Sequence, residues 1–326
     1  MTISLILPVH NAENSLPQAL LSIVAQHFRD IEIVAVDDGS TDGSLSLLET
    51  FQSESGLNSL LVRHDVNRGV AAARNSGLEV ATGDYVGFVD ADDRLEPDAL
   101  DKIAQTLETA QKPLDILGWD WILGFEKNGR IMRQADYDDP LQAVKNLMGG
   151  TMRWNMWLYL IRRDFLMQHS IRFIEGANMG EDMQFMIKSF CKAESVVQLH
   201  EPLYRYNAVS ETSLSRQFSD VRRAEIETNL AEVETVVRHS SYAEELEPTI
   251  LQLKLYLKRP LLISDDRSNY ELWYNWWPEA NAVATANKAL PTHTRFLQGM
   301  AARRCWTGVR LYYRLIYQVV YGILYR

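Results

Sequence analysis

Apolar and polar positions in the first hundred residues alternate between short apolar runs and helical stripes. The runs cover residues 3–7, 31–36, 60–62 and 85–89, with the length and flanks of buried strands. Residues 16–24, 43–52 and 70–80 instead repeat apolar side chains at helical spacing, and Pro97 marks the start of a further helix. Strands that alternate with helices predict a doubly wound α/β fold with a mainly parallel sheet.

The pattern becomes mixed after residue 113 and helical after residue 217. We expect strands at residues 157–161 and 196–199 and a helix at 181–193. Helical stripes then cover residues 221–238 and 247–257. We therefore predict a mixed α/β domain over residues 1–217 and a helical C-terminal region over residues 218–326.

Charge and cysteine content narrow the class of protein. The chain is 46% hydrophobic and 23% charged, with a formal net charge of −10. Such a surface disfavours nucleic-acid binding, which needs basic side chains to displace phosphate counterions, although a divalent metal would still allow a nucleotide to bind. Two cysteines without CxxC spacing, no leader-like start and no long apolar run favour a cytoplasmic protein.

Acidic side chains follow the predicted strands. Asp37 and Asp38 end the second strand, and Asp90, Asp92 and Asp93 follow the fourth. Ligands of open parallel sheets gather outside the carboxyl ends of the strands, so these acids are expected at one functional edge.

Each of these acidic motifs also has a plain structural interpretation. Asp90-Ala91-Asp92 can hold a hard divalent cation, but most DxD triplets are solvated turns. Asp37-Asp38-Gly39 suits a turn before a helix, and Gly180-Glu181-Asp182 suits the positive end of a helix dipole. Only their order along the chain favours a functional interpretation.

The ordered set of motifs resembles the inverting family 2 glycosyltransferases with a GT-A fold that build bacterial polysaccharides. The resemblance covers residues 2–215 and rests on six segments. These are residues 6–11 (ILPVHN), 36–42 (VDDGSTD), 67–75 (NRGVAAARN), 83–93 (GDYVGFVDADD), 180–182 (GED), and 202–204 with 213–215 (PLY and SLS).

The resemblance assigns five residues to the nucleotide. Pro8 and Val9 would offer backbone groups to the base, and Asp38 would accept hydrogen bonds from the base or ribose. Asn67 and Arg74 would hold the base and the diphosphate side.

The resemblance also assigns the reacting groups. Asp90 would touch the ribose or donor sugar, Asp92 would ligate Mn²⁺ or Mg²⁺, and Asp182 would be the general base. Two departures affect the nucleotide site: His10 stands where many members have Tyr, and Asn207 stands where an Arg often follows the last strand.

These assignments imply a metal-dependent, inverting sugar transfer. The donor would be a nucleotide diphosphate sugar, with a UDP-sugar favoured. The acceptor would be a hydroxyl of a glycan or lipid-linked glycan in surface polysaccharide synthesis. Two alternatives are a non-catalytic carbohydrate-binding protein on the same fold and an NAD-dependent oxidoreductase. The oxidoreductase would need a GxGxxG turn after the first strand, where residues 8–13 contain no glycine.

The C-terminal segment, residues 303–326, is basic, aromatic and amphipathic. After Glu279 the chain has seven basic and no acidic residues. Leu311 and Leu315 begin an apolar stripe, which predicts a helix at the inner face of a membrane. The alternative is that this stripe packs on the protein while Arg310 and Arg314 face water.

Overall fold

The computed structural model describes residues 1–124, 129–207 and 219–316. Close packing divides the chain into two units. Unit 1 comprises Met1–Ala143 and Arg153–Val236, and unit 2 comprises Val144–Met152 and Val237–Arg326. The division into a glycosyltransferase-like domain over residues 1–217 and a helical region over residues 218–326 stays a prediction.

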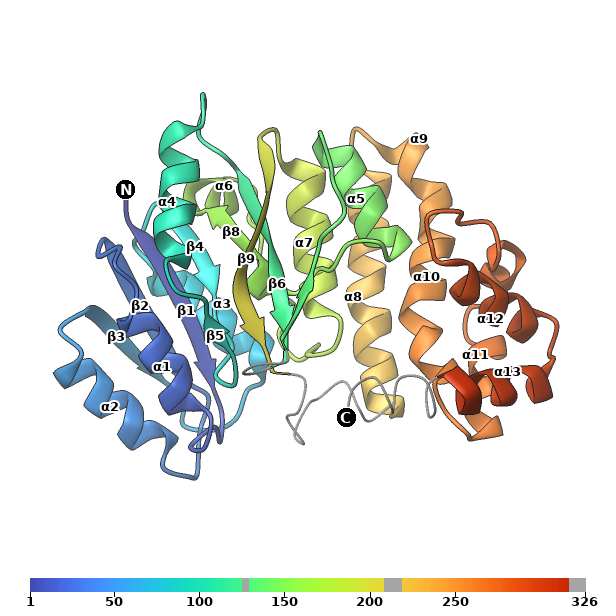
Figure 1. The fold of residues 1–326 in the computed structure, drawn as a ribbon, viewed down its shortest axis with the longest axis horizontal. Coiled ribbons are helices and arrows are strands. Elements are labelled where there is room, and N and C mark those ends of the chain that lie inside the picture. Colours follow the sequence, from blue (N-terminus) through green and yellow to red (C-terminus); the bar gives the residue numbers. More distant parts are fainter. Residues whose placement is uncertain (125–128, 208–218, 317–326) are drawn as a thin grey trace. The chain divides into compact units, whose positions relative to one another are not determined.

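Unit 1 is built on one mixed sheet of nine strands (Figure 1). The strands along its main path are, in spatial order, β3 (Asn58–Arg63), β2 (Ile31–Asp37), β1 (Ile3–Val9), β4 (Tyr85–Phe88), β8 (Tyr159–Arg162), β6 (Ile116–Leu123), β9 (Val196–Tyr206) and β5 (Arg94–Leu95). The ninth, β7 (Arg130–Met132), pairs with β6. The four N-terminal strands run parallel, as predicted, and β6 is parallel to β9. Antiparallel pairing enters at β8 and β5.

Helices cover both faces of this sheet (Figure 1). In chain order the helices up to residue 238 are α1 (Leu16–Val24), α2 (Ser44–Glu54), α3 (Val70–Val80), α4 (Ala99–Thr109), α5 (Pro140–Gly149), α6 (Arg163–Gln168), α7 (Glu181–Lys192) and α8 (Asp220–Arg238), with a 3₁₀ turn at Met156–Leu158. Of these, α5 begins in unit 1 and ends in unit 2. The strands β1 and β2 are buried almost throughout, which explains their near-continuous apolar runs. Gly77 lets α3 approach β1 closely, because a Cβ there would lie 2.5 Å from Ile6 Cγ2.

The parallel pairing aligns the carboxyl ends of the central strands. The register pairs Val9 with Asp37 at the ends of β1 and β2, and Ile6 with Phe88 at the end of β4. The acids at the ends of β2 and β4 therefore leave the sheet at the same edge, which was predicted, and they lie on either side of β1.

Unit 2 is helical. Its elements are α9 (Ala243–Leu246), α10 (Ile250–Lys258), α11 (Arg267–Asn275), α12 (Thr292–Ala302) and α13 (Trp306–Tyr312), with 3₁₀ turns at Glu247–Thr249, Arg259–Leu262 and Pro278–Val283. The segment Val144–Met152 at the end of α5 also belongs here. Asn287 Nδ2 donates to the carbonyl of Gly149 at 3.0 Å.

A fully buried lysine holds the Trp-rich segment of unit 2 together. Lys258 Nζ donates to the carbonyls of Trp276 and Trp277 at 2.9 and 3.1 Å and to Asn281 Oδ1 at 2.7 Å. The same ammonium lies 4.3 Å from the centre of the Trp273 ring. Three acceptors satisfy all three N–H groups of the lysine.

The start of the predicted membrane helix packs on unit 2 through one side. Val309 is fully buried, and Arg310 Nη2 and Arg314 Nη2 donate to the backbone and carboxylate oxygens of Asp265 at 2.9 and 2.7 Å. Leu311 and Leu315, one turn apart, stay 56% and 53% exposed. Residues 317–326 of the predicted helix lie outside the described residues. Among the described residues, no helix is long and apolar enough to cross a membrane.

Candidate functional site

The loop that follows β4 carries three acids and is held in place by the end of β9. Asp90 donates its backbone N–H to the Tyr204 hydroxyl at 3.0 Å. Asp93 is buried, and its Oδ1 accepts the backbone N–H of Asn207 at 2.8 Å. A backbone bond from Asp93 N–H to the Asp90 carbonyl, 3.1 Å long, closes the turn that carries Asp92.

Arg74 on α3 brings acids from two other elements together. Its Nη1 donates to Glu181 Oε1 at 3.0 Å and also to Asp182 Oδ1, while Nη2 lies 3.4 Å from Asp90 Oδ1. The guanidinium is almost fully buried. One cation thus joins the end of β4 to the start of α7.

The start of α7 places Glu181 and Asp182 side by side. Gly180 precedes them with a φ of +81°, a left-handed conformation that favours glycine. Both acids lie in the first helical turn, where the helix dipole favours negative charge. Asp182 Oδ2 also accepts the backbone N–H of Met156 at 3.2 Å. Each oxygen of Asp182 therefore has a donor that fixes it, the guanidinium of Arg74 on Oδ1 and the Met156 N–H on Oδ2.

Burial and crowding of negative charge shift the pKa values of this cluster. Burial, followed by the charge of Asp182, raises the pKa of Glu181 to about 8. Burial also raises the pKa of Asp90 to about 6, with Arg74 opposing the shift and Asp182 and Asp92 adding to it. Burial alone would lower the pKa of Arg74, but the three carboxylates outweigh it and raise that pKa. The cluster carries more negative charge than one guanidinium neutralises.

Asp38 organises a second part of the same sheet edge. Its Oδ1 accepts from His64 Nδ1 at 2.7 Å and from the backbone N–H of Arg68 at 2.8 Å. Its Oδ2 accepts the backbone N–H of Gly69 at 2.8 Å. The other ring nitrogen of His64 lies 2.9 Å from Ser76 Oγ. Asp38 is buried and fixes the loop that leads into α3.

The remaining predicted nucleotide ligands lie around Asp38. Pro8 and Val9 end β1, and the Val9 carbonyl accepts the backbone N–H of Asp38 at 2.8 Å. Asn67 is exposed, and its Oδ1 accepts the backbone N–H of Gly69 at 2.9 Å. The structure thus gathers the predicted residues into two groups, one around Asp38 and one around Arg74.

Sequence reasoning missed three members of these groups. His64 supports Asp38, the Tyr204 hydroxyl anchors the loop after β4, and Glu181 shares Arg74 with Asp182. Glu181 stood inside a recognised motif, directly before Asp182, so the pair of neighbouring acids could have indicated that both belong to the site. Tyr204 also stood inside a recognised segment, residues 202–204, whereas no local spacing marks His64.

The acids after β4 fit a divalent cation. They offer hard carboxylate oxygens, which Mn²⁺ and Mg²⁺ prefer. Asp93 Oδ2 is out of contact with solvent. Burial, followed by the charges of Asp90 and Asp92, raises the pKa of Asp93 well above its ordinary value. A cation near Asp92 would relieve this repulsion.

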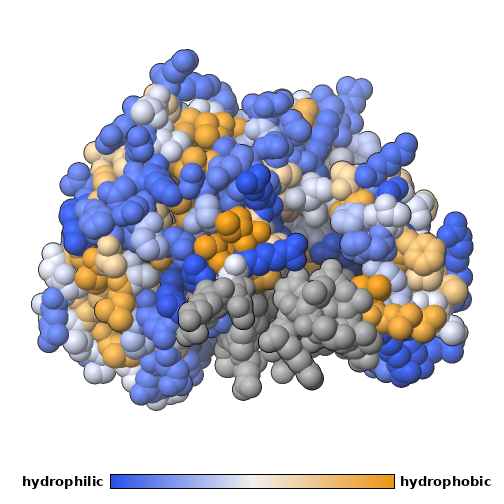
Figure 2. All heavy atoms as spheres, viewed as in Figure 1, coloured by the Kyte–Doolittle hydropathy of each residue, from blue (hydrophilic) through white to orange (hydrophobic). Residues whose placement is uncertain are grey.

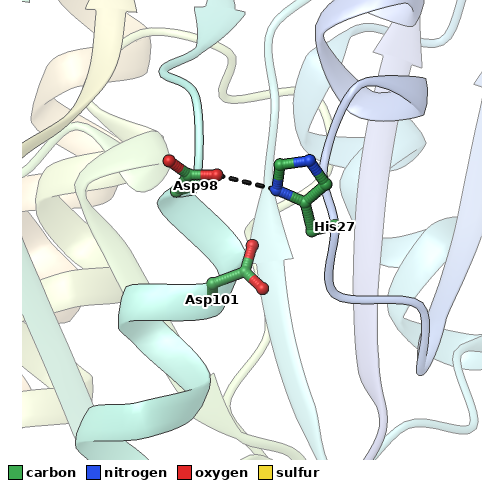
Figure 3. A group of neighbouring side chains, drawn as sticks. All are labelled: His27, Asp98 and Asp101. Carbon is green, nitrogen blue, oxygen red and sulfur yellow. Dashed lines mark hydrogen bonds and ion pairs between the residues drawn. The ribbon is translucent and has the colours of Figure 1, made fainter.

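A different group of side chains is the one three-ligand cluster found within the described residues. His27, Asp98 and Asp101 bring one ligand atom each within 4.8 Å of one another (Figure 3). His27 and Asp98 are exposed and already share a contact of 2.8 Å between Nδ1 and Oδ1. A cation on Asp92 does not need three protein ligands, because Mg²⁺ commonly takes one or two carboxylates plus phosphates and water.

Comparison with known proteins decides the family of this chain. Residues 4–185 match the family described as "Glycosyl transferase family 2", a span that includes both groups of site residues up to Asp182. The chain belongs to glycosyltransferase family 2.

Curated relatives of this family 2 chain are glycosyltransferases. It is 30% identical over 259 residues to the "Putative glycosyltransferase EpsH" of Bacillus subtilis (strain 168), which covers 76% of this chain and 74% of EpsH. It is also 30% identical over 216 residues to the "Succinoglycan biosynthesis protein ExoU" of Rhizobium meliloti (strain 1021), covering 61% of this chain and 59% of ExoU.

Solved structures establish the fold of this family 2 chain. S. aureus TarS 1–349 in complex with UDP-GlcNAc matches with a TM-score of 0.71 and 21% identity, covering 98% of this chain and 92% of that one. The mannosyltransferase PcManGT from Pyrobaculum calidifontis, in complex with GDP-Man and Mn²⁺, matches with a TM-score of 0.55 and 19% identity, covering 95% and 84%. The predicted GT-A fold is confirmed.

Proposed function

We propose that this glycosyltransferase moves a sugar from a UDP-linked donor to a hydroxyl of a glycan or lipid-linked glycan during synthesis of a surface polysaccharide. The observation that carries the proposal is the cluster of Arg74 with Asp90, Glu181 and Asp182 at the strand ends of a family 2 chain. The UDP-GlcNAc in TarS and the name of ExoU support the donor class and the polysaccharide setting.

Asp182 acts as the general base in this proposal. Arg74 and the Met156 N–H fix its two oxygens, and the carboxylate can take the proton of an acceptor hydroxyl. A single base without a covalent sugar–enzyme intermediate gives inversion at the anomeric carbon. A retaining route would need a second carboxylate that acts as nucleophile.

Asp92 holds Mn²⁺ or Mg²⁺ in this proposal. When bound, the cation stabilises the negative charge that develops on the leaving diphosphate. Asp93 and Tyr204 keep the loop of Asp92 in place, and Asp90 faces the donor. The nucleoside would bind at the carboxyl ends of β1 and β2, beside Asp38 and the loop at Arg68 and Gly69 that Asp38 holds in place.

Arg74 has protein partners that the sequence did not predict. Its described partners are three carboxylates, so we propose that it positions Asp182 and Asp90. Direct binding of the diphosphate by Arg74 stays a prediction.

The membrane also belongs to the proposed setting. A lipid-linked acceptor requires the enzyme to work at a bilayer surface, and the basic C-terminal region, residues 303–326, would provide the attraction. Arg310 and Arg314 already donate hydrogen bonds to Asp265, so we do not propose that these two arginines bind lipid phosphates.

The test is release of UDP from a panel of UDP-, dTDP- and GDP-sugars, with Mn²⁺, with Mg²⁺ and with excess EDTA. We expect UDP release that needs a divalent cation and rises when a hydroxyl acceptor is added. Binding of sugars without any nucleotide release would instead support the carbohydrate-binding alternative. NMR of the product's anomeric proton decides between inversion and retention.

A further inference from the structure

One face of α12 lines a concave site within unit 2. This face begins at Thr292 and continues three, four, eight and eleven positions later with Arg295, Phe296, Met300 and Arg303. Residues at this spacing lie on one side of a helix. With Thr285 and Gly299 they line a hollow of about 240 Å³. The opposite side of α12 is buried, including Leu297 and Ala301.

Two arginines in this hollow lack an acidic partner among the described residues. Arg295 Nη2 donates to Thr292 Oγ1 at 3.2 Å, and its Nε is out of solvent with no hydrogen-bond acceptor. Arg303 Nη1 donates to the Gly299 carbonyl at 3.3 Å. Neither arginine forms an ion pair within the described chain, whereas Arg310 and Arg314 both pair with Asp265.

Apolar surface accompanies this uncompensated charge. Phe296, between the two arginines on the helix, is 62% exposed. Leu311 and Leu315 of α13 are exposed as well, and hydrophobic side chains reach the surface among these C-terminal helices in Figure 2. No acidic residue follows Glu279 in the sequence, so α12 itself carries no negative side chain.

We propose that this face of α12, defined by Arg295, Phe296, Met300 and Arg303, binds the phosphate headgroups of an anionic phospholipid bilayer. Guanidinium groups pair with phosphate oxygens through two parallel hydrogen bonds. An exposed aromatic ring between them suits the boundary of headgroups and acyl chains. The inference rests on the proposed use of a lipid-linked acceptor. It places the membrane contact on α12 rather than on the C-terminal helix predicted at residues 303–326.

The experiment measures co-sedimentation of the full chain with phosphatidylcholine vesicles, with and without phosphatidylglycerol. The test variant is the double substitution Arg295→Gln/Arg303→Gln. The matched control is Arg63→Gln/Lys112→Gln, which removes two exposed positive charges from unit 1. Melting followed by circular dichroism checks that each variant is folded.

Wild type and control should bind the vesicles that contain phosphatidylglycerol, and salt should weaken this binding. The test variant should bind about 30-fold more weakly, since each arginine near anionic lipid contributes about 1 kcal/mol. Phe296→Ser keeps the charge and should also weaken binding, which provides a second test if the double variant does not fold.

Equal binding by the test variant and the control would overturn the inference, as would wild-type binding that ignores phosphatidylglycerol. Stabilisation by inorganic phosphate without vesicle binding would overturn the lipid assignment too. UDP release, measured on the same samples, reports separately on the proposed function. A chain that binds vesicles through α12 but releases no UDP would refute the function and leave this inference standing.

Discussion

Replacing Arg74 by Met should destabilise the protein in a way that depends on pH. The substitution removes the cation that, among the described residues, pairs with Asp90, Glu181 and Asp182. Two unit charges about 4 Å apart interact by about 4 kcal/mol at an effective dielectric constant of about 20. Removing one partner of a buried ion pair costs about 3–5 kcal/mol. The three carboxylates keep some exposure, so we expect the lower end, about 3 kcal/mol at pH 8.

The pH dependence follows from the carboxylates that Arg74→Met leaves behind. Without the guanidinium, the pKa values of Asp90 and Glu181 in the folded state rise further above those of the unfolded chain. An acid with a raised folded pKa favours folding at low pH and loses that contribution as the pH rises. Burial already raises the pKa of Glu181 to about 8 and that of Asp90 to about 6. The stability gap between wild type and variant should therefore be small near pH 5 and largest at pH 8.

Urea unfolding followed by circular dichroism, repeated between pH 5 and pH 8, measures this gap. Arg162→Met is the matched control, because Arg162 forms a partly buried ion pair with a single acid, Asp115, in the same unit. Its loss should cost less and vary less with pH. A gap for Arg74→Met that is the same at pH 5 and pH 8, or absent at both, would refute the electrostatic reasoning.

Four further substitutions test the remaining assignments. Asp92→Asn should remove most UDP release and raise the Mn²⁺ concentration needed for the rest; unchanged activity of this variant would exclude Asp92 as the metal ligand. Asp182→Asn should keep donor affinity, measured by calorimetry, while transfer falls by about 10²–10⁴-fold. Glu181→Gln resembles the protonated acid, which the raised pKa of Glu181 favours at neutral pH, so transfer at pH 7 should largely persist. If transfer fell as far as in Asp182→Asn, Glu181 would be a catalytic residue. Lys258→Met removes the ammonium donor from the Trp276 carbonyl and Asn281 Oδ1, while the Trp277 carbonyl keeps the backbone N–H of Ala280. The variant should lower the stability of unit 2 by about 1–3 kcal/mol, measured as a lower urea midpoint.

The sequence predicted best what depends on local pattern. The strands β1 and β2 could be predicted because both faces are covered, and most of their positions are therefore apolar. The mixed half was harder, because β8, β6 and β9 pair in an order that no local pattern encodes. Helix α7 was predicted to within one residue at its end.

Within the site, residue types were easier to predict than partners. Asp38, Asp90 and Asp182 were all singled out, but the bond from Arg74 to Asp182 spans 108 positions and has no local signature. The same holds for His64, whose contact with Asp38 spans 26 positions. Such contacts depend on tertiary packing, so a single sequence shows the candidates and the fold decides which of them meet.

The segment Val144–Met152 limits how this protein can be dissected. It is encoded between the two halves of unit 1 but buries Leu147 and Met148 within unit 2, where Gly150, with a φ of +76°, lies against the Tyr256 ring. A truncated protein that ends at residue 236 would expose Leu147 and Met148 to solvent, because the helices of unit 2 that bury them would be missing. We expect such a protein to aggregate. Domain exchange between relatives would have to carry two separated pieces of chain at once. During synthesis this segment is made before residues 237–326, so it cannot be buried in unit 2 until the rest of that unit has been translated.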